Sequence, residues 1–256
     1  MIIIAVLCTQ LALADSLYTH GYYEAARIEY ARDFFFYPEL EQNLEARMHY
    51  AIASLRIDST QGIDMLNSLV SDFPELPDSF RTEIATQYIL AGRYYLAIHL
   101  LHNTEEKKLL GLAYLMDDQF SNARAVFIKN GDYALAGLID QYLQNPQKSE
   151  RTAVLLSVFL PGSGEVYAGN LGLGVRDFFV NLCSGYLFYN AIRQHKYVDA
   201  SLAFLFLFNR FYMGSLHNAQ KTALEYNEKI RREWLENVIE SNFNDPELKT
   251  LSPTRP

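Results

Sequence analysis

The sequence predicts an all-α protein in two parts, a helical repeat region followed by a membrane module. In the first part, apolar residues recur with helical spacing and small residues recur about every 35 residues. In the second part, two apolar runs at 171–192 and 198–216 have the length that a bilayer core of about 30 Å requires. No alternating pattern of convincing length predicts a strand.

The composition limits the classes of partner. The 256 residues are 50% hydrophobic and 14% aromatic, which excludes a disordered chain. The net charge is -8, whereas nucleic-acid binding needs a basic stripe that the sequence lacks. The mean hydropathy of -0.07 averages a polar majority with an apolar third quarter. The expected partners are therefore proteins and lipid, with no nucleic acid.

Residues 1–14 form the first predicted element, a secretory signal peptide. Their short apolar core ends in Ala12-Leu13-Ala14, a small-x-small cleavage site that precedes Asp15. Basic residues usually follow the initiator Met, and a true start site farther upstream would supply them. An ordinary first apolar helix is the alternative.

The clearest repeat unit begins at Leu110. Its small residues Gly111 and Ala123 would let two antiparallel helices approach closely, and Tyr114 and Phe127 would fill the space around the crossing. Asp118 stands at the turn between the two helices. The repeat signature, with its weaker copies, is carried by Gly21, Ala26, Tyr30, Gly92, Ala97, Gly111, Tyr114, Ala123 and Phe127.

Other residues mark the helix ends of this region. Pro38 and Pro74 each follow a predicted second helix, because the proline ring blocks helix continuation. The spacing between Ala97 and Ala123 is compressed, which predicts a shortened helix near residues 102–103. The run 34–37 places four aromatic rings in succession, and one helix face cannot bury them all.

The order of Leu, Gly or Ala, Tyr, a turn residue, Ala and Phe resembles the tetratricopeptide repeat over residues 15–148. The resemblance implies a right-handed superhelix of helix pairs whose concave face binds an extended peptide or a helix. Stacked repeats bury only their neighbours' faces, so an open surface remains. A nonrepeating helical bundle is the alternative for this region.

Residues 149–218 form the predicted membrane module. Its first apolar helix, 152–160, is too short to span a bilayer, and the glycine-rich turn that follows favours a re-entrant or interfacial arrangement. The turn resembles the P-G-x-G-Q-x-Y-x-G motif of a bacterial family with two membrane spans. Glu165 stands where that family usually has Gln, so its deep burial is unexpected unless the carboxyl group is paired. The motif residues are Pro161, Gly162, Gly164, Glu165, Tyr167 and Gly169.

Five polar residues interrupt the two apolar runs. A charge at the bilayer centre costs about 2.5–3.5 kcal/mol, so we expect the helices to insert as a pair with these residues facing inward or toward an interface. Asp177 would neutralise Arg176 or Arg210, and a conduction or ligand-binding role is the alternative. The five residues are Arg176, Asp177, Asn181, Asn209 and Arg210.

The remaining segments bear on the orientation. The turn at 193–196 is short and basic, which favours the cytoplasmic side of a membrane. With an exported N-terminus, the repeats and the C-terminal tail would both be periplasmic. Residues 219–243 are predicted to form an amphipathic helix, and residues 244–256 a disordered tail.

The function predicted from these features is that of a noncatalytic, membrane-tethered scaffold or adaptor of the cell envelope. It would sit at the bacterial inner membrane and bind a protein partner through its repeats. No motif for catalysis, cofactor binding or metal binding is found. One alternative is a hairpin subunit of an oligomeric transport or channel assembly. Small residues that would allow self-association of the hairpin are Gly172, Gly174, Ser184 and Gly185. A third reading is a soluble helical protein with an unusually apolar core.

Overall fold

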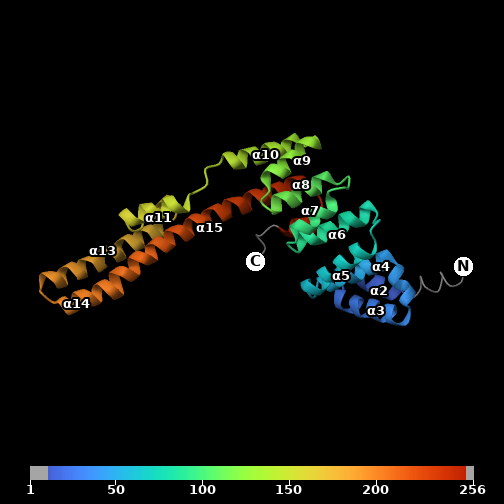
Figure 1. Cartoon of the computed structure of the whole chain (residues 1–256), viewed down its shortest axis with the longest axis horizontal. Coiled ribbons are helices and arrows are strands. Elements are labelled where there is room, and N and C mark those ends of the chain that lie inside the picture. The colour runs from blue at the N-terminus through green and yellow to red at the C-terminus, as the bar shows by residue number, and fades with distance from the viewer. Residues whose placement is uncertain (1–10, 252–256) are drawn as a thin grey trace. The chain divides into compact units, whose positions relative to one another are not determined.

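The computed structural model describes residues 11–251, and all regular structure within this range is helical (Figure 1). The predicted all-α class is therefore confirmed. The chain divides into two compact units, Met1–Ile139 and Asp140–Pro256. The division falls inside helix α10 (Tyr133–Gln144), somewhat earlier than the predicted boundary at residue 148.

Unit 1 is built from antiparallel helix pairs in which the two helices of a pair pack against each other, and contacts continue from α3 to α4 and from α7 to α8. A short helix, η1 (Pro38–Gln42), joins the first pair to the second. The first helices of neighbouring pairs also touch, α2 with α4 and α6 with α8. The four pairs are α2 (Ala12–Thr19) with α3 (Tyr23–Phe36), α4 (Leu44–Leu55) with α5 (Ser59–Asp72), α6 (Asp78–Leu90) with α7 (Tyr94–Leu101), and α8 (Lys107–Met116) with α9 (Phe120–Lys129).

A common turn geometry recurs in unit 1. After α2, the Gly21 N–H donates to the Tyr18 carbonyl and the Tyr22 N–H to the Leu17 carbonyl, both at 2.9 Å, which is the Schellman pattern. The turn residues with positive φ are Gly21, Gly92, Asp118 and Gly131. Five positions after each stands a buried alanine, namely Ala26, Ala97, Ala123 and Ala136. The signature residues thus mark a turn geometry that recurs in unit 1, and sequence reasoning missed its further copy at Gly131.

The predicted crossing around Gly111 is also present. A Cβ atom on Gly111 would overlap the ring of Phe127, so the two helices of the fourth pair touch there. Ala123 and Phe127 are fully buried, and Tyr114 is half-buried. The missing side chain of Gly111 is what allows α8 and α9 to pack this closely.

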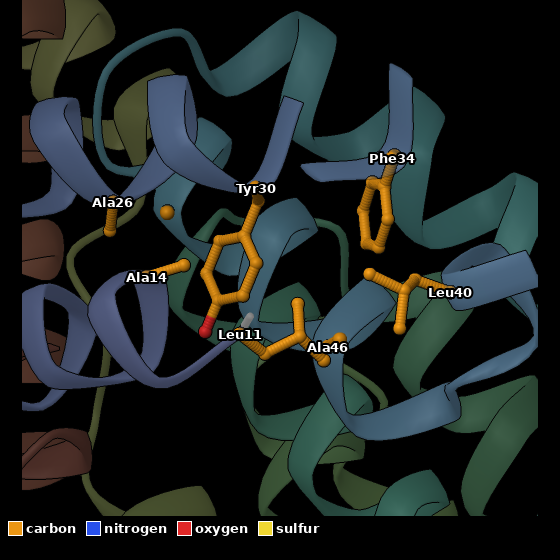
Figure 2. Close-up of a cluster of buried hydrophobic side chains, with 8 residues drawn as sticks. Leu11, Ala14, Ala26, Tyr30, Phe34, Leu40 and Ala46 are labelled. Carbon is orange, nitrogen blue, oxygen red and sulfur yellow. The ribbon is translucent and has the colours of Figure 1, made fainter. Parts of the chain in front are cut away.

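Figure 2 shows the core of the first two pairs, which surrounds the fully buried Tyr30. The Tyr30 hydroxyl donates to Asp15 Oδ1 at 2.5 Å, and burial is the main cause that raises its pKa. Leu11 and Ala14 belong to the same core. The last part of the predicted signal peptide is therefore packed in this structure, while residues 1–10 lie outside the described range and cleavage stays a prediction.

The predicted helix ends are confirmed. Helix α3 ends just before Pro38 and α5 ends just before Pro74, and α7 is a short helix that ends at Leu101. In the aromatic run, Phe34 is buried. Phe35 and Phe36 are exposed and contact each other edge to face, with ring centroids 5.2 Å apart. The aromatic run therefore contributes one ring to the core and two rings to the surface.

Unit 2 is a long helical hairpin with a shorter helix along it (Figure 1). Helix α13 runs out, and the continuous stretch from α14 through the π-helical segment η2 into α15 returns beside it. Near its other end, α15 carries Trp234, whose ring stacks on Tyr142 with centroids 4.5 Å apart. The elements of this unit are α11 (Glu150–Phe159), α12 (Ser163–Tyr167), α13 (Leu171–Arg193), α14 (Tyr197–Leu202), η2 (Ala203–Phe208), α15 (Asn209–Asn242) and η3 (Leu248–Leu251).

Several predicted elements of unit 2 change in detail. The short apolar helix is present as α11. The predicted amphipathic helix at 219–243 is the second half of α15 rather than a separate element. Within the predicted disordered tail, η3 forms a helical turn and buries Leu248. Alanines allow α11, the turn and α15 to pack closely, and these are Ala153, Ala168, Ala219 and Ala223.

Within residues 11–251, no helix combines the length and the apolar character needed to cross a bilayer. The two predicted spans at 171–192 and 198–216 are therefore not supported, although helices form at both places. The charges explain the difference. After Arg176 and Asp177, only residues 178–192 of α13 stay free of charge, which is roughly 22 Å at about 1.5 Å per residue, against a core of about 30 Å. Arg210 shortens the second run in the same way.

Candidate functional site

The predicted membrane turn forms the base of the unit 2 hairpin. Ser149 caps α11 by accepting the Thr152 N–H at 3.3 Å, and α11 ends at Phe159. Gly162 then adopts a left-handed conformation with φ +95°, which glycine adopts without strain. The Gly162 N–H donates to Ser215 Oγ of α15 at 3.2 Å. This bond joins the turn to the far helix.

Two further glycines of this region allow close backbone contacts. A Cβ atom on Gly164 would overlap the Ala153 carbonyl of α11, and one on Gly174 would lie 2.5 Å from the Gly162 carbonyl oxygen. Neither distance is one that real Cβ atoms adopt. Helices α11, α12 and α13 therefore meet backbone to backbone at the turn, which explains why glycine stands at Gly164 of the motif and at Gly174 beyond it.

Glu165 lies inside this junction and is fully buried. Its carboxyl group accepts the Ser157 hydroxyl at 3.0 Å and the Ser215 hydroxyl at 3.5 Å, and it is hydrogen-bonded to Asp177. Ser157 Oγ in turn accepts the Gly164 N–H at 3.0 Å. Burial raises the pKa of the Glu165 carboxyl, and the bond to Asp177 raises it further, so a protonated Glu165 can donate to the Asp177 carboxylate. The expectation that Glu165 would be buried only if paired is met.

Asp177 connects this acid to both helices of the hairpin. The Arg176 guanidinium donates to Asp177 Oδ1 at 2.8 Å, and Asn218 Nδ2 of α15 donates to Asp177 Oδ2 at 2.7 Å. One turn farther along α13, Asn181 Nδ2 donates to the Asp177 carbonyl at 2.8 Å and approaches the Phe211 carbonyl at 3.4 Å. The buried polar cluster thus ties α12, α13 and α15 together.

The outer face of the hairpin has the opposite character. Helix α13 buries Gly174, Asp177, Asn181 and Ser184, which share one face at helical spacing. Large apolar side chains cover its exposed side, and the returning helix also exposes large apolar residues. Exposed members of this set, with Phe159 at the end of α11, are Leu171, Phe179, Leu182, Tyr186, Tyr189, Val198, Leu205 and Phe206. Along residues 177–187 of α13, polar side chains therefore face inward and large apolar side chains face outward.

An apolar groove lies on this outer face, between the end of α11 and the two hairpin helices. Its volume is about 580 Å³, within the range of roughly 300–1,000 Å³ found for small-molecule sites. The Tyr212 hydroxyl bounds it by donating to the Val158 carbonyl at 2.9 Å. Its apolar lining includes Phe159, Pro161, Phe178, Leu182, Tyr186 and Tyr212.

The predicted intramembrane polar residues separate into two groups. Asp177 and Asn181 face inward as expected, and Arg176 is paired with Asp177 although its own side chain is half-exposed. Asn209 and Arg210 are exposed on α15, so of the two predicted placements, inward or toward an interface, only the second is open to them. The predicted pairing of Asp177 is present with Arg176, and Asn218 is a further partner.

Tyr167, the aromatic residue of the turn motif, is held by contacts within unit 2. Its ring packs against the alanine core, its hydroxyl accepts the Ser149 N–H at 3.2 Å, and Lys148 Nζ lies 4.8 Å from the ring centroid. Among the small residues proposed for self-association, Gly174 and Ser184 are buried within the chain.

Sequence reasoning missed three members of the polar cluster: Ser157, Ser215 and Asn218. Ser215 shares a helix face with the buried Ala219 and Thr222, and this spacing is visible in the sequence. Ser215 was missed because it lies at the end of a predicted membrane span, 198–216, where it was counted as part of the apolar run. Ser157 lies in the short apolar helix, where no periodic signal distinguishes it.

Glu165 and Asp177 are both buried, and their hydrogen bonds are made to groups of the same unit. Within residues 11–251, no group of three His, Cys, Asp or Glu side chains has metal-binding geometry. No family model, no curated protein and no solved structure matches the chain.

Proposed function

We propose that this protein is a noncatalytic scaffold that attaches to a lipid membrane through the apolar hairpin of unit 2 and holds a protein partner on unit 1. The observation that carries the proposal is the inverted burial on α13. Asp177 and Asn181 are inside, whereas Phe179, Leu182 and Tyr186 are outside. Contiguous exposed apolar surface of this kind marks an interaction site.

Lipid fits this surface better than a single protein partner does. The exposed apolar residues occupy both helices of the hairpin, including Val198 and Phe206 on the returning helix. A bilayer solvates several faces of an inserted element at once, while polar groups inside a lipid-exposed bundle need partners within the chain. The bonds of Asp177 and Glu165 supply such partners. The proposal requires insertion of the hairpin into lipid, without requiring that it cross the bilayer.

Unit 1 supports the scaffold half of the proposal. The repeated turn with its buried alanine, and the contact between Gly111 and Phe127, favour a tetratricopeptide-like array of helix pairs. Such arrays leave extended surfaces open to partners. Location at the bacterial inner membrane, with unit 1 on the periplasmic side, is a further part of the proposal and rests on the predicted export signal.

Vesicle flotation tests the lipid half. The full-length protein, mixed with vesicles of phosphatidylethanolamine and phosphatidylglycerol, should rise with the lipid in a density gradient and stay with it at high salt. The double variant Phe179→Glu/Tyr186→Glu places two charges on the exposed face and should remain at the bottom. The control variant is Tyr95→Glu, which changes an equally exposed aromatic residue of unit 1 and should float.

Two results would contradict the proposal: wild-type protein that does not rise, or a double variant that floats as well as wild type. Circular dichroism of each variant confirms that its helical content is retained. Release of the wild-type protein by high salt would indicate a surface attraction between charges, and would also contradict apolar insertion.

A further inference from the structure

A second groove lies in unit 1. It is formed by α3, η1, α4 and α5, and its volume is about 560 Å³. The second helices of the first two pairs thus contribute its walls. Its floor is apolar and consists of the buried Phe34 with the half-buried Tyr50 and Met65. The rings of Phe34 and Tyr50 meet edge to face, with centroids 5.5 Å apart.

The rim of this groove is acidic. Glu41 of η1 and Asp64 of α5 are exposed at its edge, together with Asp58, which also caps α5 by accepting the Thr60 and Gln61 N–H groups. Glu41 and Asp64 have no role in capping either helix.

The basic groups nearby do not balance these acids. Arg47 lines the groove, but its guanidinium is bound to Asp72 at 2.7 Å and to Ser68 at 3.3 Å. The Arg27 guanidinium donates to the Gln61 side-chain oxygen at 3.2 Å, which is a neutral group of the groove. The groove therefore keeps an excess of negative charge above an aromatic and aliphatic floor.

From this combination we infer that the groove binds a basic polypeptide segment, in which an arginine or lysine side chain lies over Tyr50 and Met65 with its charged end between Glu41 and Asp64. Long basic side chains join an apolar stem to a cationic end, which matches the floor and the rim together. A guanidinium can also stack on aromatic rings, so arginine suits the floor best. The inference rests on the proposed scaffold function, because it specifies the class of partner that unit 1 holds.

Calorimetric titration of the full-length protein in mild detergent tests the inference. The probe is the blocked pentapeptide acetyl-Ala-Arg-Leu-Arg-Ala-amide, and the comparison peptide has Glu in place of both arginines. The arginine peptide should bind and the glutamate peptide should not. The double variant Glu41→Gln/Asp64→Asn should weaken binding about fivefold, as expected for the loss of two partly exposed charge contacts.

Two more variants make the test specific. Glu39→Gln removes a neighbouring exposed acid of η1 that does not line the groove, and its affinity should match wild type. Asp64→Lys reverses the rim charge and should abolish binding of the arginine peptide. All these positions are exposed, so the fold should be retained, as circular dichroism can check.

Three results would overturn the inference: equal binding of the two peptides, no loss in the double variant, or binding of N-acetyl-arginine amide as tight as that of the pentapeptide. The last result would indicate a small cation instead of a polypeptide. Flotation separates this outcome from failure of the membrane proposal, because the groove variants should rise with vesicles as wild type does.

Discussion

The carbonyl oxygen of Gly174 occupies the space that a Cβ atom on Gly162 would need, and the Gly162 carbonyl blocks Gly174 in the same way. The turn before the hairpin and the first turns of α13 are therefore in direct backbone contact. Any side chain at either position must separate them. Because Glu165 and Asp177 bond across the same junction, the geometry of the whole cluster depends on this pair of glycines.

Replacing Gly174 with Ala should accordingly destabilise unit 2. The added methyl group meets the Gly162 carbonyl and the Val166 side chain, and overpacking of this kind costs about 1–3 kcal/mol or more. The matched control is Gly172→Ala on the same helix, where the nearest atom would be 3.8 Å away. There, alanine should leave stability unchanged or add about 0.5–1 kcal/mol. Chemical denaturation followed by circular dichroism measures both, and equal stabilities would refute the contact.

In unit 1, Gly111→Ala should separate α8 from α9. Its methyl group would overlap the buried ring of Phe127, at a cost of about 1–3 kcal/mol. Adding Phe127→Leu should recover part of the loss, since the smaller side chain leaves room. Gly137→Ala in α10 meets open space and should stabilise by about 0.5–1 kcal/mol. Urea denaturation of these three variants and of Phe127→Leu alone tests this, and additive effects of the changes at Gly111 and Phe127 would argue against their contact.

Glu165→Gln should change the pH dependence of stability. Burial raises the pKa of Glu165, so the folded state holds its proton more tightly than the unfolded chain. Its contribution to stability is therefore fully present below the unfolded-state pKa and is lost as the pH rises through the folded-state pKa. Glutamine does not titrate, so the Tm of the variant relative to wild type should be higher at pH 8 than at pH 4. Each kcal/mol of stability recovered corresponds to about 2–4 °C in Tm.

Thermal unfolding in mild detergent at several pH values measures this difference. Glu228→Gln is the control, because Glu228 is exposed on α15. Its substitution should change Tm by the same amount at every pH. A Glu165→Gln variant whose Tm stays parallel to wild type from pH 4 to pH 8 would show that the Glu165 carboxyl titrates normally.

Much of unit 1 could be predicted because its signals are local. Gly21, Gly92 and Asp118 mark turns that need a positive φ, and Pro38 and Pro74 stop helices by their own covalent structure. The spacing of small residues then indicates which helices touch. The exposure of Phe35 and Phe36 beside a buried Phe34 was open, because it depends on which neighbour each ring meets.

The hairpin base was harder to predict because its contacts join distant segments. Asp177 pairs with its neighbour Arg176, as one reading of the sequence had it, but its second partner is Asn218 on the far helix. Hydropathy alone could not separate the inward Asn181 from the outward Asn209. Helical spacing does place Asn181 on one face of α13 with Gly174, Asp177 and Ser184, and this is the buried face. The position of Asn181 could therefore be predicted if small and polar residues are taken to mark the inner side of the helix.

The stacking of Trp234 on Tyr142 has a practical consequence. The chain contains one tryptophan, and it lies in unit 2. Intrinsic indole emission therefore reports on the contact between α15 and Tyr142 of α10, while the far-ultraviolet signal reports on helices throughout the chain. If the two units unfold independently, a Gly111→Ala variant will lose part of its far-ultraviolet signal at a lower temperature than that at which its indole emission changes. A single melting experiment can thus tell whether the repeat array and the hairpin lose their structure together or in sequence.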